Sequence, residues 1–318
     1  MEFGFAWFTR GAAADAAGAE TLALAGERLG FRYMLVPDHV VIPADINSTY
    51  PYSPDGSFPG QGIGSCLDTL ASIAFIAGRT RTMRLLTSVM VVPHRPPLLT
   101  AKMISTIDVL SGGRVTIGCG AGWMEEEFKA LQLPDFAERG RVTDEYLNVF
   151  KTVWTNEVAS FDGDYVSFSN VSTLPLPVQN PHPPLWIGGE SAPAMRRAAR
   201  LGDAWYPIGN NPRFPMDTLP RLTRRAARLE ELCAEEGRDP ATLGRAYWSH
   251  WNNENQVVKN ADGDRMLLTG SVDAMVDDIN QMKALGFRHL MMNFAAPDVT
   301  GMADRMQVFA EQVMPRID

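Results

Sequence analysis

The sequence predicts an α/β fold in which eight parallel strands alternate with helices, the (β/α)8 or TIM barrel. Eight short apolar runs are each followed by a stretch with helical periodicity, and about 300 residues suit eight such units. The run at 114–118 is also too uniformly apolar for a half-solvated sheet edge. A doubly wound sheet is the alternative, but it rarely needs eight regular units and does not explain the long loops.

The first four units reach residue 154. Their strands are expected at 2–8, 31–36, 83–92 and 114–118, and their main helices at 13–29, 66–78, 96–110 and 141–154. Leu22, Ala25 and Leu29 share one face of the first helix, and Gly30 ends it. The three glutamates at 125–127 suit the first turn of a further helix, where negative charge favours the helix dipole.

The regular alternation breaks between 155 and 184. Residues 161–165 resemble a hairpin turn, and five prolines between 175 and 184 then exclude regular structure. We interpret this as an insertion before the fifth strand, because the alternation resumes after it. The remaining strands are expected at 185–188, 203–206, 243–248 and 288–293, with helices at 191–201, 217–236, 271–285 and 301–313. The chain is interpreted as one domain over 1–318, with long loops at 43–65 and 249–268 after the second and seventh strands.

Composition narrows the function classes. The net charge of −8 argues against nucleic acid as a partner. No run of 18 uncharged apolar residues is present, and the N-terminus lacks the regions of a signal peptide. The three cysteines, Cys66, Cys119 and Cys233, are far apart, and no His or carboxylate positions show metal-ligand spacing. A cytoplasmic protein without metal that acts on a small molecule is expected.

Asp38 and His39 come just after the second predicted strand, behind Pro37, and active sites lie at this end of a barrel. Histidine titrates near neutral pH and a neighbouring carboxylate can tune it, so this pair is the best acid–base candidate. The alternative is a polar turn whose carboxylate caps the chain.

Glycine-rich turns follow the fourth and fifth predicted strands. Gly118, Gly120 and Gly122 remove side chains at alternate positions, so the backbone there can approach another group closely. The stretch 188–191 (Gly-Gly-Glu-Ser) opens a helix, and its free N–H groups and the Ser191 hydroxyl suit a phosphate. Either turn alone could be a tight connection without a ligand. Both at one barrel mouth favour a phosphorylated, planar cofactor.

Aromatic side chains recur at the predicted strand ends. Any one of them is more often core packing, but so many at one rim favour a wide apolar pocket with few charges. The residues assigned to this substrate pocket are Trp7, Tyr50, Trp123, Trp205, Trp248 and Trp251. The loop that carries Tyr50, Tyr52 and Phe58 is a candidate lid over the pocket.

Three motifs carry a family resemblance. GGRVTIGCGAGWMEEEF at 112–128, PHPPLWIGGESAPAMRRAARLGDAW at 181–205 and TSV at 87–89 resemble the bacterial luciferase-like superfamily, most of all its coenzyme F420-dependent oxidoreductases. The resemblance covers nearly the whole chain. It implies a (β/α)8 barrel, usually a homodimer, with a non-proline cis peptide at Ser88-Val89 behind the cofactor ring. The cofactor-binding residues that it implies are Asp38, Ser88, Val89, Gly120, Ala121, Gly122, Gly189, Glu190 and Ser191, with backbone at 189–191 on the phosphate, 120–122 near the ribityl chain and Asp38 facing the ring.

The resemblance also implies a reaction. His39 is the implied proton donor or acceptor, and Asp38 orients it. Some F420-dependent sugar-phosphate dehydrogenases have a catalytic glutamate directly after the glycine turn of strand four, where this chain has Trp123. Hydride transfer between F420 and an apolar or aromatic substrate is therefore expected. Two alternatives stay open: an FMN-dependent monooxygenase that uses reduced flavin and oxygen, and a non-catalytic flavin-binding barrel.

Overall fold

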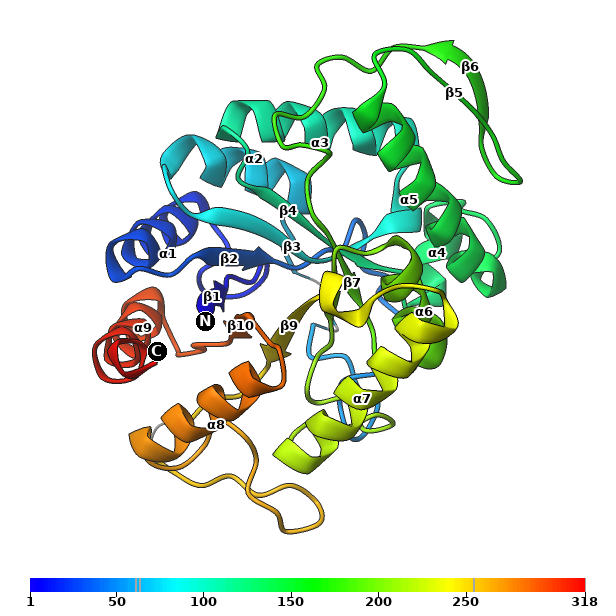
Figure 1. The fold of residues 1–318 in the computed structure, drawn as a ribbon. Coiled ribbons are helices and arrows are strands. Elements are labelled where there is room, and N and C mark those ends of the chain that lie inside the picture. Colours follow the sequence, from blue (N-terminus) through cyan, green and yellow to red (C-terminus); the bar gives the residue numbers. More distant parts are fainter. Residues whose placement is uncertain (61, 63, 254, 318) are drawn as a thin grey trace.

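The computed structural model describes residues 1–60, 62, 64–253 and 255–317, and its centre is a closed barrel of parallel strands (Figure 1). Around the barrel the strands follow the order β1-β10-β9-β8-β7-β4-β3-β2. Their bounds are β1 Glu2–Ala6, β2 Tyr33–Val36, β3 Arg84–Val91, β4 Val115–Gly120, β7 Leu185–Gly188, β8 Ala204–Tyr206, β9 Gly244–Ser249 and β10 His289–Met292. The predicted (β/α)8 fold class is confirmed.

Helices surround the barrel (Figure 1). Their bounds are α1 Ala16–Leu29, α2 Thr69–Arg79, α3 Pro97–Ser111, α4 Glu125–Ala130, α5 Arg139–Thr155, α6 Ala192–Leu201, α7 Leu219–Glu235, α8 Val272–Ala284 and α9 Val299–Gln312. The Asp68 side chain accepts a hydrogen bond from Ala71 N, so α2 begins after this cap and not at 66. The predicted stop at Gly30 is a left-handed C-cap with φ 83°, and Ser191 caps α6 as expected.

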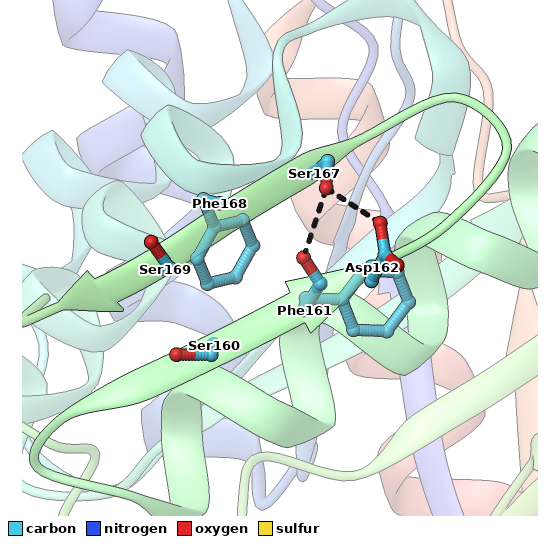
Figure 2. Close-up of a pocket in the computed structure, with 6 residues that line it drawn as sticks. All are labelled: Ser160, Phe161, Asp162, Ser167, Phe168 and Ser169. Atoms are coloured by element: carbon cyan, nitrogen blue, oxygen red, sulfur yellow. Dashed lines mark hydrogen bonds between the residues drawn. The ribbon is translucent and has the colours of Figure 1, made fainter.

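The predicted insertion is an antiparallel hairpin of β5 Ala159–Asp162 and β6 Ser167–Val171. It lies at the periphery of the molecule, next to α5 (Figure 1). Phe161 and Phe168 stack across the hairpin with ring centroids 6.1 Å apart. Figure 2 shows them lining a shallow surface pocket with serine hydroxyls and Asp162. This pocket belongs to the hairpin and not to the barrel mouth.

The strand residues form two apolar layers, because successive side chains point to opposite faces of a strand. The inner layer fills the barrel with Ala6, Tyr33, Leu35, Leu86, Trp186, Ala204, Tyr206, Ala246 and Met291. The outer layer lies between strands and helices and contains the sequence neighbours of those residues, such as Phe5 and Met34. The barrel interior is thus packed, and ligands can bind only at its mouth.

Trp7 and Trp205 lie in the outer layer, which corrects their assignment to the substrate pocket. They are 1% and 0% exposed, and their indole N–H groups donate to backbone carbonyl oxygens at 2.8 and 2.9 Å. Their neighbours Phe8 and Tyr206 pack on the inner layer instead. Position at a strand end alone therefore did not decide which tryptophans reach the mouth.

The structure also shows whether any helix could span a membrane and whether side chains gather as metal ligands. Among the described residues, no helix combines the length and apolar character needed to cross a membrane. Within the same residues, no three His, Cys, Asp or Glu side chains gather where they could hold a metal ion. Cys66, Cys119 and Cys233 are free thiols, and the last two are buried.

Candidate functional site

Strand β3 is irregular at the mouth of the barrel. The Ser88-Val89 peptide bond is cis, which confirms that prediction. The pairing of β3 with β4 shifts register between Thr87 and Met90, so the strand bulges there. The Ser88 hydroxyl lies 2.9 Å from the Tyr206 hydroxyl, and this contact ties the bulge to β8. Contact between the bulge and a cofactor stays a prediction.

Glycines around the bulge make room for it. A Cβ on Gly120 would lie 2.6 Å from Val89 Cγ2, and one on Gly188 would lie 3.1 Å from Val89 Cγ1. On Gly118 it would lie 2.1 Å from a backbone oxygen of β3. The sequence predicts that another group approaches these glycines closely. In these contacts, that group is strand β3 of the protein itself. The stretch 120–122 is half-buried, and its place beside a ribityl chain stays a prediction.

Asp38 forms a buried salt bridge with Arg95. Its carboxylate accepts hydrogen bonds from Arg95 at 2.8 and 2.9 Å and from Val91 N at 3.0 Å, and its side chain is 0% exposed. Burial alone would raise the pKa of Asp38, but the hydrogen bonds and charge of Arg95 outweigh burial and lower it. This corrects the prediction that Asp38 orients His39, since the Asp38 carboxylate joins β2 to β3 and His39 has another partner. A position of Asp38 facing a cofactor ring stays a prediction.

His39 is instead held by Glu127, which lies 88 positions away in the sequence. The His39 Nδ1 atom is 2.8 Å from Glu127 Oε2, and the His39 side chain is 15% exposed. Glu127 is 1% exposed, and its Oε1 accepts from Val40 N and Val41 N at 2.8 and 3.1 Å. The glutamates at 125–127 are therefore more than a helix start.

The loop after β2 covers Trp123. The ring centroids of Tyr50 and Phe58 lie 5.0 and 5.2 Å from that of Trp123, and Phe58 lies 5.1 Å from the His39 ring. We call His39, Tyr50, Phe58 and Trp123 the aromatic cluster. Burial raises the pKa of Tyr50 to about 12, so its hydroxyl stays neutral. The structure thus brings the candidate lid and the candidate acid–base residue together.

Glu126 anchors this loop to α4. Its carboxylate accepts from Asn47 N at 2.8 Å, from Ser48 N at 3.1 Å and from Ser48 Oγ at 2.6 Å. Farther along the loop, Asn210 Nδ2 donates to Tyr52 O at 2.7 Å, which ties the loop to the segment after β8. Two adjacent glutamates of α4 therefore hold the lid and His39.

The turn after β7 is the predicted phosphate site. Gly189 has φ 103°, and Ser191 is the helix cap. The buried Glu190 side chain accepts from Ile208 N at 2.9 Å and from Asn211 Nδ2 at 2.7 Å. Burial outweighs these hydrogen bonds and raises the pKa of Glu190 to about 7. Glu190 braces the turn against the segment after β8, and phosphate binding by the backbone of 189–191 stays a prediction.

Trp248 and Trp251 occupy different positions. Trp248 packs on the inner layer at the end of β9, with its ring centroid 4.3 Å from that of His250. Trp251 Nε1 donates to Leu267 O at 2.7 Å, and a Cβ on Gly209 would lie 2.7 Å from the Trp251 ring. Trp251 is therefore wedged between two loops, whereas Trp248 lies at the mouth.

Polar atoms near Trp248 are buried without a hydrogen-bond partner. In the described part of the chain these include Trp248 Nε1, His250 Nε2 and Asn293 Oδ1, at the ends of β9 and β10. Burial lowers the pKa of His250 to about 4, so its ring is neutral at pH 7. Because buried polar groups are normally paired, these three atoms distinguish this part of the mouth from the rest of the packed interior.

Sequence reasoning missed Glu127 and Arg95, and it placed Asn293 at the end of the last strand without assigning it to the site. Glu127 stands in a run of glutamates that looks like an ordinary helix start, and Arg95 precedes two prolines in what looks like a turn. Their partners are brought near only when β2, β3 and β4 lie side by side in the sheet. Asn293 follows the last strand directly, and its position at a strand end was the one available signal.

The closed barrel agrees with the comparison to known proteins. The family model described as luciferase-like monooxygenase matches residues 1–248. The chain belongs to this family. An uncharacterised protein from Mycobacterium tuberculosis is 32% identical over 243 residues, which cover 75% of this chain and 80% of the relative.

Two further matches have named activities. The FMNH2-dependent dimethylsulfone monooxygenase of Pseudomonas putida is 32% identical over 192 residues, which cover 60% of this chain and 48% of that enzyme. The solved structure of the coenzyme F420-dependent tetrahydromethanopterin reductase from Methanopyrus kandleri superimposes with a TM-score of 0.77. The superposition covers 100% of this chain and 99% of the reductase chain, at 15% sequence identity. This match supports the luciferase-like fold.

Proposed function

We propose that this luciferase-like protein is an F420-dependent oxidoreductase that transfers a hydride between the deazaflavin and a small apolar or aromatic substrate. The observation that carries the proposal is the position of His39. It is held by a buried carboxylate, packs on Phe58 in the aromatic cluster, and follows Asp38, which binds the strand just past the bulge. A single proton-transfer group against an aromatic wall suits a substrate that gains or loses a hydride and a proton.

The residues at the mouth fit a flavin-type cofactor. The unpaired atoms of Trp248, His250 and Asn293 offer neutral donors and acceptors for the polar edge of a flavin-like ring. The backbone of 189–191, at the start of α6, would hold a phosphate. When bound, F420 supplies the ring carbon that accepts or releases the hydride. The sequence motifs resemble the F420 branch, which supports F420 over FMN.

The aromatic cluster supports the substrate class. Its rings would contact an apolar or aromatic molecule, and the cluster contains no Lys or Arg to pair with a phosphate group. His39 would take up or release the substrate proton. The lid, packed on Trp123, would exclude water from the site.

Thermal unfolding with pure F420 or pure FMN tests the cofactor. We expect F420 to raise the melting temperature, with a stabilisation of about 2.7 kcal/mol at 100 times its Kd. Trp248→Phe, which removes an unpaired N–H, should weaken the response, whereas Phe168→Ala on the hairpin should not. Tight binding of FMN with no response to F420 would overturn the proposal.

An FMN-dependent monooxygenase is the second candidate. It is favoured by the match to the FMNH2-dependent enzyme of Pseudomonas putida. Oxygen uptake that requires reduced FMN, with one oxygen atom entering a tested substrate, would establish it. Hydride exchange with F420 in the absence of oxygen would decide for the first candidate.

A further inference from the structure

We infer that Glu127 is a positioning residue that fixes the tautomer of His39, so that Nε2 is the nitrogen that exchanges a proton with the substrate. The inference rests on the proposed role of His39. It adds a residue that neither the motifs nor the family match assigns. Glu127 is suited to the task because it is buried, contacts His39 at 2.8 Å and lies on a helix that also anchors the lid.

The hydrogen bonds of Glu127 allow one arrangement. An ionised carboxylate can only accept hydrogen bonds, so His39 Nδ1 must be the donor. The other oxygen is occupied by the N–H groups of Val40 and Val41, which can only donate. The neutral His39 ring therefore carries its proton on Nδ1 and its lone pair on Nε2.

His94 is the other histidine beside Glu127. Its Nδ1 lies 3.6 Å from Glu127 Oε1, and its side chain is 3% exposed. Burial lowers the pKa of His94, so this ring is neutral at pH 7. When His39 takes a proton on Nε2, the positive charge therefore forms on the ring that Glu127 contacts directly.

Replacement of Glu127 by glutamine gives a sharp test. The glutamine oxygen must face the N–H groups of Val40 and Val41, so its NH2 group faces His39 Nδ1. Nδ1 must then accept, and the ring proton moves to Nε2. We expect 15N NMR of the histidine rings to report the Nδ1–H tautomer in the wild type and the Nε2–H tautomer in Glu127→Gln. Turnover should fall about 100-fold or more through kcat, with little change in KM.

Two variants serve as controls. Glu126→Gln changes the adjacent carboxylate, which contacts Asn47 and Ser48 and not His39, so the His39 tautomer should stay as in the wild type. Glu127→Asp keeps an acceptor-only group and should retain the Nδ1–H tautomer with part of the turnover. The five histidines of the chain are assigned by His→Gln replacement one at a time.

The NMR measurement needs no cofactor, so it separates this inference from the proposed function. An Nε2–H tautomer of His39 in the wild type overturns the inference, whether or not Glu127→Gln folds. An Nδ1–H tautomer in Glu127→Gln also overturns it. A tautomer change in Glu127→Gln, together with unchanged turnover of His39→Ala, supports the positioning by Glu127 and instead overturns the proposed role of His39.

Discussion

Asp38 and His39 are neighbours in sequence but belong to different contact networks. The Asp38 carboxylate turns towards β3 and binds Arg95 and Val91 N, while the His39 ring turns towards α4 and Glu127. Adjacent residues in extended chain point to opposite sides, and so an Asp-His pair in sequence need not be a pair in space. In the proposed function, the residue that contacts the proton-transfer group His39 is therefore Glu127 and not Asp38.

Arg95→Met tests the structural role of the Asp38 salt bridge. At pH 7 we expect the free energy of unfolding to fall by about 3–5 kcal/mol, because a buried charge loses its partner. The pKa of Asp38 is lowered from 3.8, so the stability it contributes is present above about pH 4 and is lost as the pH falls through its folded-state value. The deficit of the variant should therefore shrink at low pH. Urea unfolding from pH 3 to 7 measures it, and a pH-independent deficit would contradict the assignment.

Trp7→Ala and Trp123→Ala should have opposite effects. Trp7 is 1% exposed in the outer layer, so its loss should cost about 3–5 kcal/mol of stability. Trp123 has three aromatic contacts in a half-buried cluster, so its loss should cost only about 1–2 kcal/mol. Ligand binding should weaken in Trp123→Ala and stay intact in folded Trp7→Ala. Urea unfolding and ligand titration give both quantities, and weaker binding in Trp7→Ala alone would restore that residue to the pocket.

At the scale of elements, β3 and β4 form one interlocked unit. Val89 projects from the bulge towards Gly120 of β4 and Gly188 of β7. A Cβ would collide with Val89 at Gly120 and would press closely on it at Gly188. Gly122, just past β4, has φ 90°, and a Cβ there would lie 2.6 Å from Phe128 Cε2. The glycine-rich motif is thus explained first by strand packing, which leaves its backbone open to the mouth.

A double-mutant cycle tests this interlock. Gly120→Ala should lower the free energy of unfolding by about 1–3 kcal/mol, because the new methyl group meets Val89 Cγ2. Adding Val89→Ala removes the colliding atom. The double variant should therefore lose about 1 kcal/mol or more less stability than the sum of the losses in the two single variants. Gly118→Ala is the matched control. Its methyl group meets a backbone oxygen at 2.1 Å, and Val89→Ala should not rescue it.

At the scale of the whole molecule, Glu190 should shape the pH dependence of stability. Burial raises its pKa from 4.5 to about 7, so the folded state holds the proton more tightly than the unfolded state does. The contribution of Glu190 to the free energy of unfolding is therefore fully present below about pH 4.5 and is lost as the pH rises through about 7. The free energy of unfolding should fall by about 3 kcal/mol at most over this range. Glu190→Gln should flatten this part of the profile. Unfolding measured at half-unit pH steps checks it, and an unchanged slope in the variant would contradict the burial argument.

The sequence predicts the barrel well, because strand and helix periodicity are local properties of the chain. It also places His39 and Trp123 at the mouth by their position after strands. It fails for Trp7 and Trp205, since a one-residue uncertainty in where a strand ends exchanges its inner and outer faces. Glu127 is invisible locally because its partner is 88 positions away and meets it only when β2, β3 and β4 lie side by side in the sheet.

The assembly and location of the protein stay predictions. The resemblance implies a homodimer, for which light scattering should give a mass of about twice the 35.0 kDa of the chain. A monomeric mass at micromolar concentration would contradict it. A cytoplasmic location rests on composition alone and is checked by cell fractionation.

The anchoring of the lid at both ends has a practical consequence for protein engineering. Glu126 fixes the loop at Asn47 and Ser48, and Leu67 N donates to Thr9 O beyond its other end. The segment 49–65 lies between these fixed points, so it can be exchanged while both anchors are kept. Chimaeras that carry the equivalent loops of relatives would vary the range of substrates. The bulge, His39 and Glu127 would stay unchanged in all of them.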